Sequence, residues 1–444
     1  MHLLERSRTA RGWSRTDLAT RLCELGRARG ISLGTGKDGV LRWEHGRRPD
    51  RPTQVLIAEL LGIPEEVAAQ QPWPNWLSAD PVQQPTHHCW NASGAVEALY
   101  EVSGSDMEID RRSFTFLTGA TLTASLMSWL TADPAAAGQI SQGQRIGETA
   151  VAHIERRVRE LRHTDDTNGG GQLLEEAHAS MGMVARLLKD RSYTDAHGVR
   201  LHAAAADFAR MRAWAAFDTR GECPDDAFDA ALHAAHAASD AALGAHVLAF
   251  WSIAAYNTER PADAEAMVTA ALAAARGRTT DRVMAMLLSR RARARAHQND
   301  PACWADLDRS AELLDASDHA VDEDPDWVYW YDRCELLGAI ASTHLDMNQP
   351  GRAEAVFAEA ASLYPADRVR THALFLSRQA DAQWRQNDLE RACATADQAL
   401  DLTVDISSHR STGPLLELAA KMRAHNAVPA VRDFRERATA ILAA

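Results

Sequence analysis

The chain has 444 residues, of which 46% are apolar and 25% charged, so it is not disordered throughout. Six cysteines are scattered over this length without a CxxC pair, which excludes a disulfide scaffold and favours a reducing compartment. The formal net charge is −13, yet residues 1–52 hold 12 Lys and Arg against 6 Asp and Glu, and so carry +6 while the remainder carries −19.

The first two predicted elements are short helices in this basic head. The first ends near Gly12. Ser14 is a good N-cap for the second, and Asp17 three residues later completes a start that resembles a capping box. Leucines then repeat at helical spacing from Leu18 to Leu25, until residues 30–36, which hold three glycines, end the helix.

Two further helices are predicted in the head. The third runs from about Thr35 to His45, and Gly46 ends it as a C-terminal glycine does. Its apolar face holds Val40, Leu41 and Trp43. A fourth helix follows between the prolines at 49–52 and the Gly62-Ile63-Pro64 turn. A small basic helical domain on a large acidic body suggests that the head meets a polyanion.

Four further features of the head belong together: Gly12-Trp13-Ser14, Leu18-Ala19, the segment Trp43–Pro49 and the segment Ala58–Pro64. With them, about 65 residues resemble the lambda-repressor/XRE family of helix-turn-helix domains, in the variant found in large actinobacterial regulators. One departure is the segment Cys23–Gly36, which is longer than the usual turn and leaves the start of the recognition helix open by a few residues.

The resemblance implies that the third helix enters the major groove of duplex DNA and that the start of the second helix binds phosphate. Residues of the recognition helix would contact bases or phosphates: Thr35, Lys37, Asp38 and Arg42. The phosphate backbone would be held by Ser14, Arg15 and Thr16 at the start of the second helix and by Arg47 and Arg48 after the recognition helix. Trp43 and Leu41 are expected to pack in the core, and Glu44 to brace the turn.

A composition break follows the head, so we predict a domain over residues 1–70, a proline-rich linker over 71–109 and a connecting helix over 110–143. We expect Trp73, Trp76 and Trp90 to anchor the linker on a neighbouring domain. Arg111-Arg112 before an apolar stretch resembles a twin-arginine export signal, but a buried helix is the preferred interpretation and export or membrane anchoring the alternative. With no leader expected at Met1, we predict a cytoplasmic protein.

Residues 144–444 are predicted to form a helical repeat array. Prolines and an Asn-Asp pair mark recurring helix starts, 37 to 49 residues apart, and we count six clear helix pairs from about residue 196 with one or two weaker ones before them. Small residues recur along the second helices, as at Ala264, Ala353 and Ala392. The array resembles the tetratricopeptide (TPR) family, especially Gly351–Phe357 with Tyr364-Pro365. An irregular helical bundle is the alternative.

A TPR-like solenoid has a groove lined by the first helix of each pair, where such domains take peptides. The candidate effector contacts there are Arg210, Trp214, Trp251, Asn257, Arg290, Arg293, Tyr329, Trp330, Arg333 and Trp384. The arginines at 290–295 form a basic cluster suited to a carboxylate, and the acidic body favours a cationic or mixed-charge peptide.

The sequence holds no convincing catalytic pattern, so we predict neither an enzyme nor a cofactor. The Gly34–Lys37 segment lacks the strand and spacing of a phosphate loop. His87-His88-Cys89 has no second ligand pair at zinc-like spacing, so no metal is predicted.

These observations favour an all-α cytoplasmic transcriptional regulator. Its partners would be an operator in double-stranded DNA, a second copy in a homodimer, and a peptide, small molecule or partner protein in the groove, with no membrane. The alternative is a protein-interaction adaptor whose head does not bind DNA.

Overall fold

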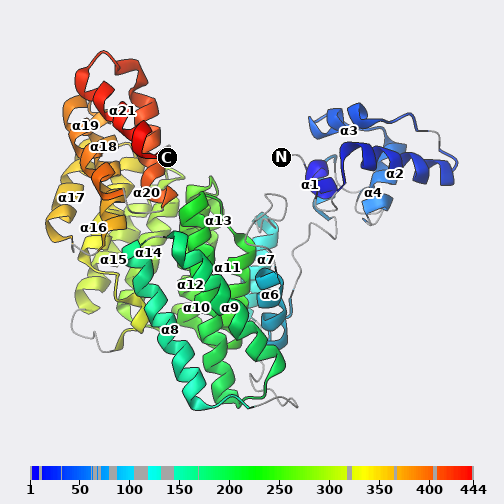
Figure 1. Ribbon diagram of the computed structural model, residues 1–444, viewed down its shortest axis with the longest axis horizontal. Coiled ribbons are helices and arrows are strands. Elements are labelled where there is room, and N and C mark those ends of the chain that lie inside the picture. The colour runs from blue at the N-terminus through cyan, green and yellow to red at the C-terminus, as the bar shows by residue number, and fades with distance from the viewer. Residues whose placement is uncertain are drawn as a thin grey trace. The chain divides into compact units, whose positions relative to one another are not determined.

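The computed structural model describes most of the chain, and every regular element in the part it describes is a helix (Figure 1). It describes residues 3–9, 13–31, 33–61, 63, 68, 72–79, 88–104, 119–131, 145–168, 170–317, 323–364, 368–403 and 408–442. Extended pairing within these ranges is limited to one isolated parallel bridge between Arg145 and Ser192. The predicted all-α class is therefore confirmed.

The chain divides into two compact units. The N-terminal unit comprises residues 1–87 and 106–117, and the helical body comprises residues 88–105 and 118–444. This division differs from the predicted linker, because residues 92–104 of that segment form a helix of the body. The Arg111-Arg112 pair lies outside the described residues.

The described part of the N-terminal unit holds four α-helices and one 3-10 helix. Their bounds are α1 Leu3–Thr9, α2 Arg15–Ala28, α3 Lys37–Glu44, α4 Arg51–Leu61 and η1 Asn75–Ala79. The predicted capping box is present, since the Asp17 N–H donates to the Ser14 hydroxyl and the Ser14 N–H donates to the Asp17 carboxylate. Leu18, Leu22 and Trp43 pack in its core.

The connection between α2 and α3 explains why the predicted start of the third helix was uncertain. Gly30 adopts a φ of 72°, which favours glycine, and the Ile31 N–H bonds back to the Gly26 carbonyl at 2.8 Å. Ile31 and Leu33 then pack against the core before the chain enters α3 at Lys37. The longer turn is therefore an ordered part of the core around residues 31 and 33, and Thr35 precedes the helix.

The tryptophans of the predicted linker are divided between the two units. Trp73 and Trp76 pack against the core of the N-terminal unit, with ring centroids 5.6 Å apart. Trp90 stacks on His233 of the body, with ring centroids 3.8 Å apart. Helix α6 (Ala92–Gly104) follows and packs against the body helices at 170–190 and 225–237. Large apolar rings thus fix both ends of this segment, as expected for Trp73, Trp76 and Trp90.

The body continues with α7 and then a run of antiparallel helix pairs. Helix α7 spans Gly119–Thr131 and buries Leu122, Leu126 and Trp129. The pairs are α8 Glu148–Asn168 with α9 Gly170–Asp190, α10 Asp195–Arg220 with α11 Asp225–Ala237, α12 Ala241–Asn257 with α13 Pro261–Ala275, α14 Asp281–Ala296 with α15 Cys303–Ser317, α16 Arg333–Asp346 with α17 Pro350–Leu363, α18 Val369–Arg385 with α19 Leu389–Thr403, and α20 His409–Lys421 with α21 Pro429–Leu442. The six pairs predicted from about residue 196 are present.

Four of the turns inside these pairs share one backbone feature. A non-glycine residue with positive φ stands before the second helix at Glu259, Asn299, Asn348 and Asn387. Pro261 and Pro350 then occupy the first turn of α13 and α17, where a missing N–H costs nothing. Residues within each turn therefore determine where the second helix of a pair begins, which is why the prolines predicted the helix starts.

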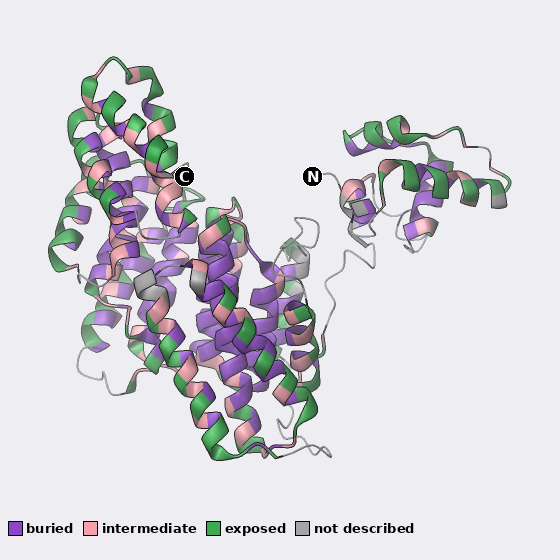
Figure 2. Ribbon diagram, in the orientation of Figure 1, coloured by how far each residue is buried: buried purple, intermediate pink, exposed green. Residues whose placement is uncertain are grey.

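The pairs form a solenoid-like stack whose C-terminal part also contacts its beginning. Figure 2 shows buried residues concentrated in α10, α11 and α12, which have neighbours on nearly every side. Helix α20 contacts α10, and the Ser408 hydroxyl donates to the Asp218 carboxylate at 2.9 Å across 190 residues. This long-range contact brings distant hairpins to one site.

Candidate DNA-contacting surface and arginine pocket

The predicted DNA-contacting side chains lie mostly on the exposed surface of the N-terminal unit. Seven of the nine are exposed: Ser14, Thr16, Lys37, Asp38, Arg42, Arg47 and Arg48. Arg15 and Thr35 are half-buried. Helix α3 places Lys37, Asp38 and Arg42 outward because its opposite face buries Val40 and Trp43. Leu41, by contrast, is 36% exposed, so its predicted place in the core is wrong.

Glu44 braces this surface from beneath. Its carboxylate accepts hydrogen bonds from Arg8 Nε at 2.8 Å and from Arg15 Nε at 2.5 Å, and its side chain is 1% exposed. Arg15, a predicted phosphate contact, is therefore held by a carboxylate at one edge of its guanidinium. The Ser14 hydroxyl is likewise engaged in capping, although its helix keeps an exposed N-terminus.

The cations of α3 and of the turn after it have few partners within the unit. Arg42 Nε donates to the Asp38 carbonyl at 3.2 Å, one helical turn away. Lys37, Arg47 and Arg48 make no ion pair with any residue that the structure describes. Exposed cations without carboxylate partners are available to a polyanion.

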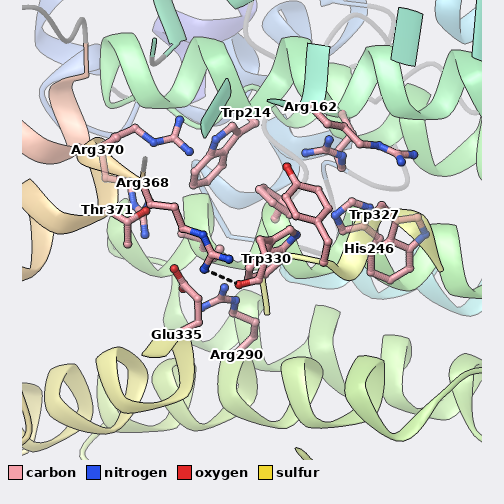
Figure 3. A pocket seen from close by; sticks show the side chains of 15 residues that line it. Arg162, Trp214, His246, Arg290, Trp327, Trp330, Glu335, Arg368, Arg370 and Thr371 are labelled. Atoms are coloured by element: carbon pink, nitrogen blue, oxygen red, sulfur yellow. Dashed lines mark hydrogen bonds between the residues drawn. The ribbon is translucent and has the colours of Figure 1, made fainter. Parts of the chain in front are cut away.

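A second candidate site is a pocket inside the body, which we call the arginine pocket (Figure 3). Its empty space amounts to about 730 Å³, part of which is open to solvent. Six arginines line it: Arg162 from α8, Arg210 from α10, Arg290 from α14, Arg368 and Arg370 at the start of α18, and Arg410 from α20.

Four of these arginines have carboxylate neighbours. Arg162 bonds to Asp207 at 2.5 Å and Asp326 at 2.7 Å. Arg210 lies 3.5 Å from the same Asp207, Arg368 lies 2.9 Å from Asp332, and Arg370 lies 3.7 Å from Asp218. These pairs hold the rim of the pocket in place.

Arg290 and Arg410 have no carboxylate partner among the described residues. Arg290 is 8% exposed, its Nε has no hydrogen-bond partner there, and its guanidinium lies over the ring of Trp330 at 5.4 Å. Arg410 lies over Trp214 at 5.1 Å. Burial lowers the pKa of Arg410, and the charges of Arg370 and Arg290 lower it further, although Tyr256 and the more distant Asp218 carboxylate raise it. The pocket thus concentrates like charge.

Aromatic side chains form the remaining wall. His246 stacks on Trp327 with ring centroids 4.0 Å apart, and Phe250 meets Trp214 edge-on at 4.8 Å. Burial, and the charges of neighbouring arginines such as Arg210, hold the pKa of His246 well below its usual range. His246 is therefore neutral, and its two ring nitrogens have no hydrogen-bond partner in the described part of the body.

The structure brings together half of the predicted effector contacts. Arg210, Trp214, Arg290, Tyr329 and Trp330 line the pocket. Tyr329 and Trp330 do so from the loop between η3 (Asp326–Val328) and α16, because the chain does not become helical again until Arg333.

The other predicted effector contacts lie elsewhere. Trp251 is buried and donates to Asp225 at 2.5 Å, and Asn257 donates to the Ile253 carbonyl at 2.7 Å. Arg293 is paired with Asp346. Arg333 is exposed on α16, and Trp384, near the end of α18, packs against the core formed by α18 to α21. Helical spacing alone did not show which turns of each helix face the pocket.

The predicted basic cluster at residues 290–295 is not one patch. Arg291 and Arg295 both bond to Asp306, and only Arg290 enters the pocket. The lining is cationic, so it opposes the cationic peptide that the charge of the whole body suggested. The distribution of charge, rather than its sum, decides which ligand a pocket accepts.

Four arginines of the pocket were not predicted: Arg162, Arg368, Arg370 and Arg410. They come from residues 162 to 410, and no local pattern distinguishes them from the many surface arginines of the body. The contacts of α18 with α8 and of α20 with α10 and α18 bring them to one place.

The described residues include no group of three or more His, Cys, Asp or Glu side chains placed to hold a metal ion. His88, a residue of the His-His-Cys motif, instead pairs with Glu101 at 3.2 Å. None of the described helices combines the length and apolar character that a membrane crossing requires.

The N-terminal unit matches a known protein family. The family described as the SP15 N-terminal domain matches residues 4–63, a segment that covers α1 from its second residue and all of α2, α3 and α4. No curated protein matches the chain.

Proposed function

We propose that this protein is a sequence-specific DNA-binding transcriptional regulator whose N-terminal unit contacts duplex DNA and whose body senses an effector in the arginine pocket. The observation that carries the proposal is helix α3. It buries Val40 and Trp43 and exposes Lys37 and Arg42 at its surface, and two exposed arginines follow it. An exposed polar helix face next to unpaired cations is suited to the major groove and its phosphates.

The rest of the unit supports this role. The N-terminus of α2 is exposed beside Ser14 and Thr16, and the free N–H groups of a helix start attract phosphate. Glu44 fixes α3 to α1 and α2 through Arg8 and Arg15, so the helix is held rigidly. The excess charge of +6 over residues 1–52 attracts DNA at long range.

The protein acts as a homodimer in this proposal. A single short recognition helix makes few base contacts, and helix-turn-helix proteins place two of them on half-sites about 34 Å apart. In this proposal the body supplies both the surface through which the two copies dimerise and the site that senses the effector.

Footprinting across the DNA upstream of the protein's own gene tests the proposal. We expect the full chain to protect a pair of half-sites, and Lys37→Ala with Arg42→Ala to abolish that protection at fixed salt. Both residues are exposed, so circular dichroism of the variant should match the wild type. Glu24→Ala, on the exposed side of α2, is the matched control. Equal protection by the variant, or general coating of DNA by both, would instead favour an adaptor whose head does not read sequence.

A further inference from the structure

We infer that the arginine pocket binds the phosphate group of a small phosphorylated organic molecule. The inference rests on the sensing role proposed above and names the chemical class of the effector. The pocket is built before any ligand arrives, because its rim arginines are held by Asp207, Asp326, Asp332 and Asp218.

Two pocket arginines without an ion-pair partner indicate that the ligand is an anion. Arg290 and Arg410 face the pocket without a carboxylate within ion-pair distance among the described residues, and both lie over tryptophan rings. Glu335 also lines the pocket but forms no ion pair with either of them; burial raises its pKa, while the charges of Arg290, Arg368 and Arg410 lower it. A phosphate monoester carries close to two negative charges at neutral pH, so it balances both guanidinium groups, whereas one carboxylate balances one.

Buried hydrogen-bond donors set its chemistry. The Nε of Arg290 and the indole N–H of Trp214 are buried without hydrogen-bond partners in the described body. Neutral His246 adds one ring N–H to these donors. A phosphate offers three strong acceptor oxygens and so matches several donors at once.

The size of the pocket suits a small molecule rather than a long polyanion. Its empty space is about 730 Å³ even with the part open to solvent included, which is too small for a nucleic acid strand. The aromatic wall of Trp330 and its neighbours suits an apolar or aromatic group attached to the phosphate. Figure 3 shows Arg290, Arg368 and Arg370 pointing to the middle of the pocket beside this wall.

Calorimetric titration of the full chain at pH 8 and constant ionic strength tests the inference with three probes. These are inorganic phosphate, phenyl phosphate and benzoate. We expect phenyl phosphate to bind more tightly than inorganic phosphate, and benzoate to bind at least tenfold more weakly than phenyl phosphate. Benzoate binding as tightly as phenyl phosphate, or no heat from either phosphate, would overturn the inference without use of any variant.

Variants then locate the site. Arg290→Gln with Arg410→Gln should weaken phenyl phosphate binding roughly tenfold or more, because two charge-assisted hydrogen bonds are lost. The Tm of this variant without ligand should be equal to that of the wild type or higher, since repulsion among the arginines is relieved. Arg333→Gln, on the exposed surface of α16, is the control and should bind normally.

Two outcomes separate this inference from the proposed DNA binding. Lys37→Ala with Arg42→Ala should bind phenyl phosphate like the wild type, because the assay contains no DNA. Loss of binding in that variant would place the phosphate on the head and overturn the inference. If the chain binds phenyl phosphate through Arg290 and Arg410 but binds no specific DNA sequence, the assignment of the pocket stands and the proposed regulator role is wrong.

Discussion

The Glu44 carboxylate illustrates how a charged residue of the N-terminal unit has a structural role. It is buried between Arg8 and Arg15, and Arg8 also donates to the Trp13 carbonyl at 2.6 Å. Breaking a buried ion pair by removing one partner leaves the other charge without compensation. The helix-turn-helix resemblance suggested the bracing role of Glu44, and the structure supplies its partners.

Glu44→Ala should therefore loosen the N-terminal unit. We expect a loss of about 3 kcal/mol of local stability, since Arg8 loses its buried partner. Hydrogen exchange of the full chain, followed by mass spectrometry, should show faster exchange in α2 and α3 and unchanged exchange in the body. Glu24→Ala is the control, because its side chain is exposed. Unchanged protection of α3 in Glu44→Ala would show that the buried carboxylate is not needed.

A second prediction at this scale concerns how the contribution of Asp229 to stability depends on pH. Burial raises the pKa of Asp229 to about 7, although it accepts a hydrogen bond from Ser125 at 3.2 Å. His233 lies 3.6 Å away, and His88, Asp225 and Asp226 also act on it. Because the folded state holds a proton that the unfolded state has released, the contribution of Asp229 to stability is present below about pH 4 and is lost as pH rises to about 7.

Asp229→Asn removes this titration. The unfolding free energy of the wild type minus that of the variant should fall between about pH 4 and pH 7 and stay level above that range. Urea unfolding of both proteins at half-unit intervals of pH measures this difference. A difference that rises with pH would mean that Asp229 is stabilised as an anion, and a constant one that its pKa is ordinary.

At the scale of elements, the helix pairs were predictable because their signals are local. Backbone geometry favours proline at a helix start, and close packing favours small residues along the second helix. Both effects act within one hairpin. The capping box at Ser14 and Asp17 was predictable for the same reason. Leu41 was assigned to the wrong face of α3 because the apolar face of an eight-residue helix is narrow, and Val40 and Trp43 already fill it.

The close approach of α16 and α18 gives a prediction at this scale. A Cβ placed on Gly338 would lie 1.9 Å from the Phe375 ring, so in Gly338→Ala either the ring or the helices that carry the two residues must shift. We expect a loss of about 1–3 kcal/mol, the usual cost of overpacking. Urea unfolding of the full chain measures it. The same change should weaken phenyl phosphate binding, because α16 carries Glu335 and α18 carries Arg370.

Gly182→Ala on α9 is the matched control. Its Cβ would meet only Arg186 and Ser103 at 3.6 Å, an ordinary contact. Replacement of a mid-helix glycine should then be neutral or stabilise by up to about 1 kcal/mol. Equal effects of the two substitutions would contradict the close approach at Gly338.

At the scale of the whole molecule, the arginine pocket depends on contacts between distant hairpins. Its lining residues extend from Arg162 to Arg410, and sequence patterns report neighbours within a hairpin rather than the curvature of the stack. For this reason the sequence predicted a ligand groove but not its charge. Ligand binding between α10, α14, α18 and α20 would favour one curvature of the body, and it alters DNA affinity only if the two conformations bind the ligand unequally.

Selection of bound duplexes from a random DNA library tests the central claim, that the N-terminal unit reads DNA sequence. The full chain and Lys37→Ala with Arg42→Ala are compared at one fixed salt concentration, because phosphate contacts make affinity depend strongly on salt. We expect the wild type to enrich one motif, repeated as two half-sites about one helical turn apart or a multiple of it, and the variant to enrich none. Failure of the wild type to enrich any motif, or enrichment of the same motif by the variant, would contradict the account.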